Sequence, residues 1–353
     1  MKKKQPTLQM IAEVSGMSLN TVSRALRGNP RQSAETRARI RKIAEEIGYR
    51  PNPMVSALMA QMRSNRALRP DGGSMIAFLE PTYAEKNPFT GGVPYLTRIF
   101  AGARQRAEAL GYKLERFHLA EAGGKRMTRL LRARGILGVV LAPLPDPIPV
   151  VDFDWSRFAC STIGYSYQEA QLHRVVNDQF DTMLQTVRQL QALGYRRIGL
   201  AMRYEDDSRT EGRWTGAFRS ARSRLPEERR VPIWFWHEWE PDGFDEWVKT
   251  FRPDAVITQH GHVRRWLHEA GRRVPDDVGL ATLDIQGDQA TFSGIDQNND
   301  VIGATAVDLV VEQIHHNEYG IPARAKTVMI KGDWAPGQTT RPLPVPLPLH
   351  PPL

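Results

Sequence analysis

The sequence predicts a small all-α N-terminal unit followed by a larger α/β body, built as two lobes with parallel sheets. Three observations lead to this fold class. Two short amphipathic helices flank Gly16, basic charge gathers in residues 1–70, and apolar runs alternate with helical patterns from Ser74 onward. At 353 residues the chain is long enough to bury a large core besides the N-terminal unit.

The segment from Ile11 to Arg31 has the pattern of a helix-turn-helix. Apolar side chains are expected on one face of each helix: Leu8, Ile11, Ala12 and Val14 in the first, and Val22, Ala25 and Leu26 in the second. Gly16 can adopt the left-handed conformation that ends a helix, and Ser18 can cap the next one. The second helix then presents short polar side chains and two arginines, as a helix that reads base edges requires.

Charge separates this segment from the rest of the chain. Residues 1–70 hold 14 Lys and Arg against 4 Asp and Glu, a net charge of +10, whereas the other 283 residues hold 34 basic and 35 acidic side chains. Such helix pairs also occur in enzymes that have no nucleic-acid partner. The excess of positive charge in this segment favours a DNA partner, because neutralising the phosphates of the DNA backbone requires a basic surface.

Residues 7–52 resemble the DNA-binding headpiece of the lactose-repressor-type (LacI/GalR) transcription regulators. The resemblance is carried by TLQMIAEVSGMSLNTVSRALRG and, after it, SAETRARIRKIAEEIGYRPN, which contains a third helix expected to begin at Ser33 and end at Gly48. It implies a headpiece with a hinge helix over residues 1–61. In that hinge helix Leu58 matches a leucine that wedges into the minor groove, although ordinary packing of an exposed helix is the alternative.

The same resemblance assigns DNA contacts residue by residue. Leu19, Asn20 and Arg24 match base-reading positions, and Asn and Arg can form paired hydrogen bonds with adenine and guanine. The positions that match contacts to the DNA backbone are Thr7, Ser18, Thr21, Ser23, Arg27, Tyr49 and Asn52. Helix capping is the alternative role for the hydroxyl groups, and both roles can hold at once.

From Ser74 onward the pattern predicts a parallel sheet covered by helices on both faces. Strands are expected at 75–80, 112–117, 136–143, 158–164, 196–202, 231–236, 254–258 and 278–283, and helices at 95–110, 178–193, 211–224 and 300–315. Leu-Gly-Tyr ends a long helix twice, at 110–112 and 193–195, which suggests two similarly built lobes.

The family resemblance gives these lobes boundaries. It implies a periplasmic-binding-protein-like domain for effector binding and dimerisation over residues 74–342. Its lobe one spans about 74–174 and 302–330, and its lobe two about 175–301 and 332–341. Residues 62–73 are expected to form a linker, and the proline-rich residues 343–353 a tail.

A small-molecule effector is expected between the lobes. Arg213 matches an arginine that grips the effector in relatives, and Asp284 matches an aspartate that binds ligand hydroxyls. The further candidates are His260, which replaces the usual Asn or Ser, the aromatic residues Trp239 and Tyr83, and Asp178. The alternatives are a surface salt bridge for Arg213, core packing for the aromatic residues and helix stabilisation for Asp178.

Other classes of protein fit less well. The N-terminus lacks the apolar run of a secretory signal and no stretch of 18 apolar residues occurs, so we expect a cytoplasmic, nucleoid-associated protein rather than a transport binding protein or a membrane protein. A single cysteine, Cys160, and the lack of a Cys/His cluster predict no metal site, and we expect no other cofactor. No catalytic motif points to an enzyme.

The sequence therefore predicts a transcription regulator, more readily a repressor than an activator. We expect it to bind a near-palindromic duplex DNA operator as a homodimer, because the C-terminal end lacks the leucine heptads of a tetramer-forming helix. The family resemblance implies that its effector is a sugar or a sugar derivative.

Overall fold

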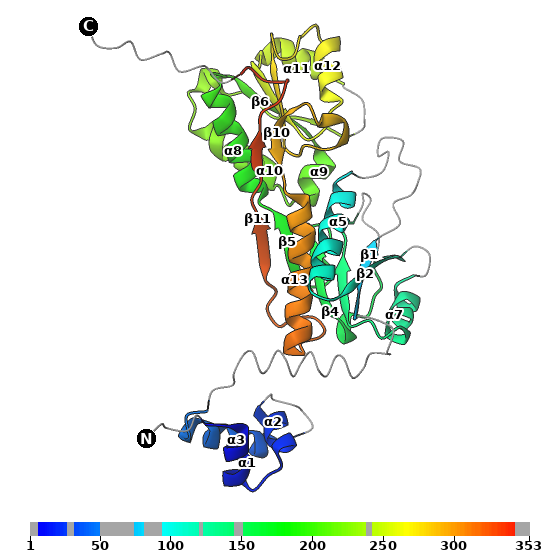
Figure 1. Cartoon of the computed structure of the whole chain (residues 1–353). Coiled ribbons are helices and arrows are strands. Elements are labelled where there is room, and N and C mark those ends of the chain that lie inside the picture. The colour runs from blue at the N-terminus through cyan, green and yellow to red at the C-terminus, as the bar shows by residue number, and fades with distance from the viewer. Residues whose placement is uncertain are drawn as a thin grey trace, which may run out of the picture. The chain divides into compact units, whose positions relative to one another are not determined.

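The computed structural model describes residues 6–26, 32–49, 74–80, 94–119, 123–144, 151–237 and 242–342. The chain divides into two compact units, Met1–Arg66 and Ala67–Leu353 (Figure 1). The expected hinge helix with Leu58, the linker at 62–73 and the tail at 343–353 lie outside the described residues.

The N-terminal unit contains three helices, α1 (Leu8–Ser15), α2 (Leu19–Leu26) and α3 (Ala34–Glu46). Local sequence explains each boundary. Thr7 and Ser33 cap α1 and α3 with their side-chain oxygens, and Gly16 ends α1 with a φ of 68°. The three helices enclose a small core of Ile11, Val22, Ala25, Ile40 and Ala44.

Val14 is the exception to the predicted apolar face of the first helix. Its side chain is 62% exposed, and Ser15 is buried in its place. Ser15 lies four residues after the buried Ile11, on the same helix face. Its hydroxyl donates to the Ala12 carbonyl oxygen at 3.3 Å, so burial leaves that hydroxyl hydrogen-bonded.

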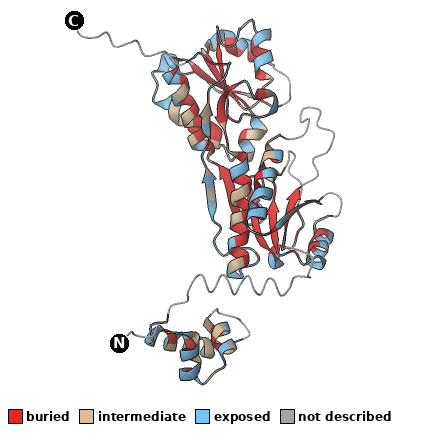
Figure 2. Ribbon diagram, viewed as in Figure 1, coloured by how far each residue is buried: buried red, intermediate tan, exposed pale blue. Residues whose placement is uncertain are grey.

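The first lobe of the body is built on a six-stranded parallel sheet in the order β11-β5-β4-β3-β1-β2. Its strands are β1 (Met75–Glu80), β2 (Lys113–His118), β3 (Gly138–Leu141), β4 (Ala159–Ile163), β5 (His173–Asn177) and β11 (Thr327–Ile330). Helices α5 (Pro94–Ala109) and α13 (Asn299–His316) cover one face, and α7 (Gly124–Ala133) packs on the other. Figure 2 shows the buried strands between these helices.

The second lobe is built on another six-stranded sheet, in the order β12-β10-β9-β8-β6-β7, in which only β12 is antiparallel to its neighbour. Its strands are β6 (Ile198–Arg203), β7 (Trp234–Trp236), β8 (Ala255–Thr258), β9 (Gly279–Thr282), β10 (Ser293–Asp296) and β12 (Asp333–Ala335). Helices α8 (Gln179–Ala192) and α10 (Arg213–Ser223) cover one face, and α11 (Phe244–Phe251) and α12 (Val263–Glu269) the other.

The predicted two-lobed α/β architecture is confirmed, and every predicted strand overlaps an observed one. The sequence pattern missed β5, β10, β11 and β12. In β10, Ser293 and Gly294 replace bulky apolar residues because the neighbouring backbone is too close: a Cβ at Gly294 would lie 2.3 Å from the Thr282 carbonyl oxygen. Strand β11 lies at a sheet edge with alternating exposure, so it lacks the apolar run of a central strand.

Two glycines set the distance between α5 and α13. A Cβ on Gly303 would lie 1.9 Å from the Ile99 carbonyl oxygen, and one on Gly102 would lie 2.0 Å from the Asp300 carbonyl oxygen. The two helices therefore touch through backbone atoms. This contact fixes α13 against the first sheet, and α13 begins where the chain returns from the second lobe.

We predict that Gly303→Ala destabilises the body, because the added methyl group meets backbone atoms that cannot rotate away. The expected loss in the free energy of unfolding is about 1–3 kcal/mol or more, measured by urea denaturation. Gly216→Ala in α10 is the matched control, because nothing lies within 4 Å of its Cβ position. That control is expected to gain up to about 1 kcal/mol. Equal stability of the two variants would contradict the close contact.

Candidate functional site

Helix α2 carries the predicted base-reading positions. Leu19 is 48% exposed and Arg24 is exposed, so both project from the N-terminal unit into solvent. The Ser18 side-chain oxygen accepts from the backbone nitrogen of Thr21 at 3.2 Å, and the two hydroxyl oxygens lie 2.9 Å apart. The predicted cap of α2 is therefore confirmed. Capping satisfies an amide that the first turn of a helix leaves without a partner.

The other predicted DNA-contacting residues have local roles in the same unit. Thr7 caps α1 by accepting from the Met10 nitrogen, and Ser23 is half-buried in α2. Tyr49 packs against the helical core, and burial raises the pKa of its hydroxyl. The Asn20 side chain lies outside the described part of the structure, as do the predicted contacts Arg27 and Asn52.

In the body, the chain passes three times between the two lobes: from β5 to α8, from β10 to α13 and from β11 to β12. The crossings are bonded to one another. The backbone nitrogen of Asp178 donates to the Ile330 carbonyl oxygen at 2.8 Å, and the Asn298 side chain donates to the Lys331 carbonyl oxygen at 3.0 Å. Because both sheets are mainly parallel, side chains that follow several strand carboxyl ends meet between the lobes.

An inner pocket of about 120 Å³ lies at this junction. It has an apolar side that includes Tyr95, Ile99 and Ile163 of the first lobe. Its polar side chains are six carboxamides and one carboxyl group: Asn177, Gln179, Gln259, Gln286, Gln297, Asn299 and Asp284. Most of the polar groups directly follow β5, β8, β9 or β10, which explains why residues far apart in sequence converge here.

Asp284 is the most perturbed ionisable group in the inner pocket. Burial of its carboxyl raises the pKa of Asp284 to about 7, although hydrogen bonds from Gln286 and Asn299 act in the opposite direction. The Asn299 amide donates to the two carboxyl oxygens at 3.3 and 3.4 Å. A buried carboxyl group held by neutral donors is suited to hydrogen-bonding a polar ligand.

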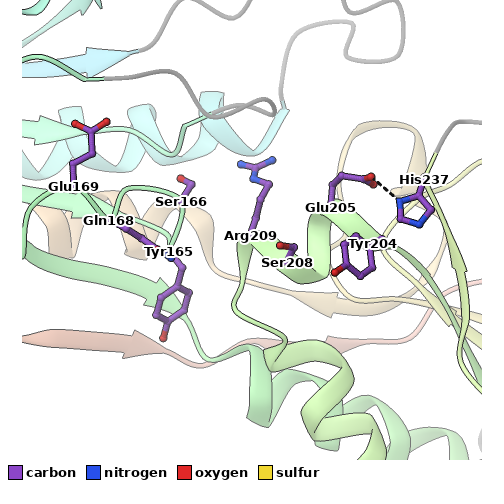
Figure 3. Close-up of a pocket in the computed structure, with 9 residues that line it drawn as sticks. All are labelled: Tyr165, Ser166, Gln168, Glu169, Tyr204, Glu205, Ser208, Arg209 and His237. Carbon is purple, nitrogen blue, oxygen red and sulfur yellow. Dashed lines mark hydrogen bonds and ion pairs between the residues drawn. The ribbon is translucent and has the colours of Figure 1, made fainter.

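An outer pocket of about 620 Å³ lies between two groups of residues, shown on opposite sides in Figure 3. The first lobe contributes Tyr165, Ser166, Gln168 and Glu169, and the second lobe contributes Tyr204, Glu205, Ser208, Arg209 and His237. The Tyr204 side chain is 51% exposed, and its ring lies 5.0 Å from that of His237. Nδ1 of His237 lies 3.1 Å from a Glu205 carboxylate oxygen, as the dashed line in Figure 3 marks.

His260 lies behind the outer pocket in a polar cluster of the second lobe. Its Nε2 atom lies 2.6 Å from a carboxylate oxygen of Asp206 in α9 (Tyr204–Arg209). Burial opposes ionisation of Asp206, yet the contact with His260 and the charges of Arg203 and Arg209 hold its pKa below the ordinary value. The ionised Asp206 therefore orients His260, which is not among the residues that line the inner or the outer pocket.

The remaining predicted effector residues divide into two groups. Arg213 lies beside the cleft, where its guanidinium group pairs with Glu211 at 3.0 Å and lies 3.9 Å from the centre of the Tyr165 ring. The Asp178 carboxylate caps α8 by accepting from the Asp181 nitrogen at 3.0 Å. The helix-stabilising role considered for Asp178 is thus present. Tyr83 and Trp239 lie outside the described residues.

Direct contacts join the lobes on both sides of these pockets. Arg98 of α5 binds the Asp296 carboxylate at the end of β10 through two hydrogen bonds of 2.9 and 3.2 Å. Gln168 of the first lobe donates to Glu211 of the second at 3.1 Å, and Arg209 donates to the Leu144 carbonyl oxygen. The two lobes therefore face each other across a cleft that polar contacts span.

Sequence reasoning identified Asp284 in the inner pocket and missed most of its neighbours. Asn and Gln are common on protein surfaces, and nothing in a single sequence distinguishes Gln259 or Gln297 from a solvated residue. A usable signal was their position directly after a strand, which Asp284, identified through the family resemblance, shares. Asn299 carried a weaker signal, because it begins a helix rather than ending a strand.

The family models match both parts of the chain. The model of bacterial regulatory proteins of the lacI family matches residues 7–52. A periplasmic binding protein-like domain matches residues 187–340. The described part of the chain contains no helix long and apolar enough to cross a membrane.

Curated relatives are named as transcriptional regulators. The HTH-type transcriptional regulator CelR of Thermobifida fusca is 24% identical over 336 residues, covering 89% of this chain and 93% of the relative. PtxS of Pseudomonas putida is 27% identical over 305 residues, 80% of each chain. The segment shared with AglR of Rhizobium meliloti is 56% identical over 45 residues, 13% of each chain.

Solved structures share the fold. A complex of the transcriptional regulator CelR with cellobiose has a TM-score of 0.54 at 19% identity, covering 95% of this chain and 100% of that one. The lac repressor dimer bound to operator and the anti-inducer ONPF has a TM-score of 0.53 at 18% identity, covering 95% and 99%.

We predict that Asp284→Asn changes how stability depends on pH. Because the pKa of Asp284 is raised to about 7 in the folded chain, the folded state holds the proton of Asp284 more tightly than the unfolded chain does. This contribution to the free energy of unfolding is present at low pH and is lost as pH rises through about 7. Relative to the unaltered chain, the Asn variant should therefore gain free energy of unfolding between about pH 5 and pH 8. Urea titrations at both values measure this change.

The exposed Asp308, which pairs with Arg106 on the surface at 2.7 Å, provides the matched control. Asp308→Asn is expected to show nearly the same difference from the unaltered chain at both pH values, since exposed pairs contribute little. If the effect of Asp284→Asn on stability does not change with pH, Asp284 is not a buried group with a raised pKa.

Proposed function

Because this chain belongs to the lacI family of DNA-binding transcriptional regulators, we propose that it is a repressor controlled by a small-molecule effector. It binds a near-palindromic operator as a homodimer, and the effector occupies the cleft between the lobes. The observation that carries this proposal is the capped helix α2, which exposes Leu19 and Arg24 from a strongly basic N-terminal unit.

We propose that each segment of the chain has the role that the family resemblance implies. Residues 1–61 form the DNA-binding headpiece with its hinge helix, 62–73 a linker, 74–342 the effector and dimerisation domain, and 343–353 a tail. Leu19, Asn20 and Arg24 read bases, whereas the hydroxyl residues, Arg27, Tyr49 and Asn52 hold the DNA backbone. Leu58 wedges into the minor groove at the operator centre.

Repression follows from the way such a dimer holds DNA. Two headpieces on one bent operator block access to the duplex without any contact to polymerase. The protein acts where the DNA is, in the cytoplasm and at the nucleoid. Net positive charge in the headpiece supports this placement, because phosphate contacts supply much of the affinity for DNA.

The effector is proposed to be a sugar or a sugar derivative. The similar CelR structure contains cellobiose, and the inner pocket offers amide and carboxyl groups suited to hydroxyl recognition. Asp284 contacts the ligand in this proposal, and Arg213 borders it beside Tyr165. Tyr83, Asp178, Trp239 and His260 complete the proposed effector set.

We predict that Arg24→Ala lowers the affinity for the operator while the headpiece stays folded, because an exposed side chain leaves no cavity behind. Loss of a base contact should cost about 1–3 kcal/mol, a factor of roughly 5 to 150 in affinity, and relax the preference at one base pair. Fluorescence anisotropy on operator variants measures both effects. Arg229→Ala, which removes an equal charge from the exposed surface of the body, is the control. An unchanged base preference in Arg24→Ala would show that Arg24 does not read a base.

We also predict that Arg213→Ala abolishes the response to effector and leaves operator affinity intact. The substitution removes a guanidinium group that lies against Tyr165, a residue of the outer pocket. Titration of an effector into a preformed protein–DNA complex measures the response. Arg224→Ala, at the exposed end of the same helix, should respond like the unaltered chain. Release of DNA by the same ligand concentration in Arg213→Ala would exclude the proposed role.

A further inference from the structure

We infer that the effector of this chain is an uncharged polyhydroxylated molecule, and that the cleft rejects sugar acids and sugar phosphates. The inference rests on the proposed function and narrows its effector class. It depends on the kinds of polar group that line the two pockets and on the hydrogen-bond partners these groups already have. It also depends on which residues the nearby arginine side chains bind.

The inner pocket presents neutral amides in place of cations. Among the described residues that line it, Asp284 is the one acidic or basic side chain. Carboxylate and phosphate groups are bound in proteins by arginine, by lysine or by clustered backbone amides. The described lining of this pocket includes no arginine or lysine. Above the pKa of Asp284, about 7, an anionic ligand would therefore meet a buried negative charge without a compensating cation.

Several of the amide donors are directed to the protein itself. Gln286 and Asn299 donate to the carboxyl group of Asp284, and Gln297 donates to the Leu283 carbonyl oxygen at 2.8 Å. An amide group that uses a donor in this way keeps its oxygen as an acceptor. These amide oxygens therefore stay available as acceptors, which suits the hydroxyl groups of a ligand.

Two amide oxygens point to the same conclusion. The Oε1 atoms of Gln179 and Gln259 are buried and have no hydrogen-bond partner within the described structure. Gln179 is only 7% exposed, and both residues line the inner pocket. A buried acceptor without a partner is destabilising, and a ligand hydroxyl that donates to it removes that cost. An ionised carboxylate has no proton to donate.

The outer pocket continues this pattern. Glu169 and Glu205 line it on opposite sides, and Gly164 of the inner pocket directly precedes Tyr165 of the outer pocket. Its cation, Arg209, donates to the Leu144 carbonyl oxygen, and His237 is held by Glu205. The pocket then presents the carboxylates of Glu169 and Glu205, which already have protein partners, and the exposed ring of Tyr204. Aromatic faces beside hydrogen-bond acceptors suit an uncharged sugar ring.

Among the described residues, three arginines near the cleft already have protein partners. Arg98 binds Asp296 and Asp300, and Arg213 pairs with Glu211. Arg174 is buried, and its guanidinium group donates to the Gly164 and Tyr167 carbonyl oxygens. Each of these arginines therefore already has an oxygen partner that an anionic ligand would have to share. Within the described residues, the discrimination against anions therefore follows from these pairings as well as from Asp284.

The test compares matched ligands on the full chain. Thermal shift and titration calorimetry are run with uncharged mono- and disaccharides, including glucose and cellobiose, and with the corresponding aldonic acids, uronic acids and 6-phosphates. We expect at least one uncharged sugar to bind at least about tenfold more tightly than every charged counterpart. In Asp284→Asn, which removes one carboxyl group, this ratio should fall by several-fold. Asp308→Asn should leave the ratio unchanged.

The outcomes separate this inference from the proposed function. Equal or tighter binding of an acid or a phosphate overturns the inference, and so does a panel in which no uncharged sugar binds. Operator binding by the same protein samples is measured separately by anisotropy. A chain that selects no duplex sequence overturns the proposed function, whichever sugars it binds.

Discussion

The three crossings between the lobes are the constraint on which the rest of the structure depends. They run side by side and bond to one another, as when Asn298 donates to the Lys331 carbonyl oxygen at one crossing and to Asp333 beyond it. A joint of adjacent crossings is the kind of connection about which one lobe can rotate against another. It also directs the carboxyl ends of two sheets toward one cleft, where the polar side chains that follow the strands gather.

The cleft combines this geometry with an unusual electrostatic arrangement. Asp284 is almost completely buried beside neutral amides, while Arg98 neutralises the nearby Asp296 from the opposite lobe. The contacts across the cleft, such as that of Gln168 with Glu211, belong to the same surfaces that a ligand would touch. Ligand binding and lobe position therefore depend on shared groups, which is the physical requirement for coupling an effector to a distant event.

Much of the fold could be predicted from the sequence, because the signals are local. Gly16 and Ser18 mark the turn of the N-terminal helices, and buried central strands appear as apolar runs. The failures have physical causes. Strand β10 contains Gly294 because a neighbouring backbone lies against it. Ser15 is buried in place of Val14 because it lies on the same helix face as Ile11, and its hydroxyl is satisfied within the helix.

The site was predicted less completely than the fold. Asp284 was found through the family resemblance, but His260 turns to Asp206, a partner contributed by the short helix α9. The carboxamides of the inner pocket come from four different parts of the chain, and only the folded topology brings Asn177 and Gln297 together. A single sequence records neither side-chain pairing nor convergence between distant segments.

The most direct test of the account measures the coupling between the cleft and the DNA. A duplex selected by the full chain from a random pool is titrated with the protein alone and with a saturating uncharged sugar that raises its melting temperature. The account predicts affinities that differ by about fivefold or more, because the ligand shifts the balance between lobe arrangements. Identical affinities for the selected duplex, with the cleft demonstrably occupied, would contradict it.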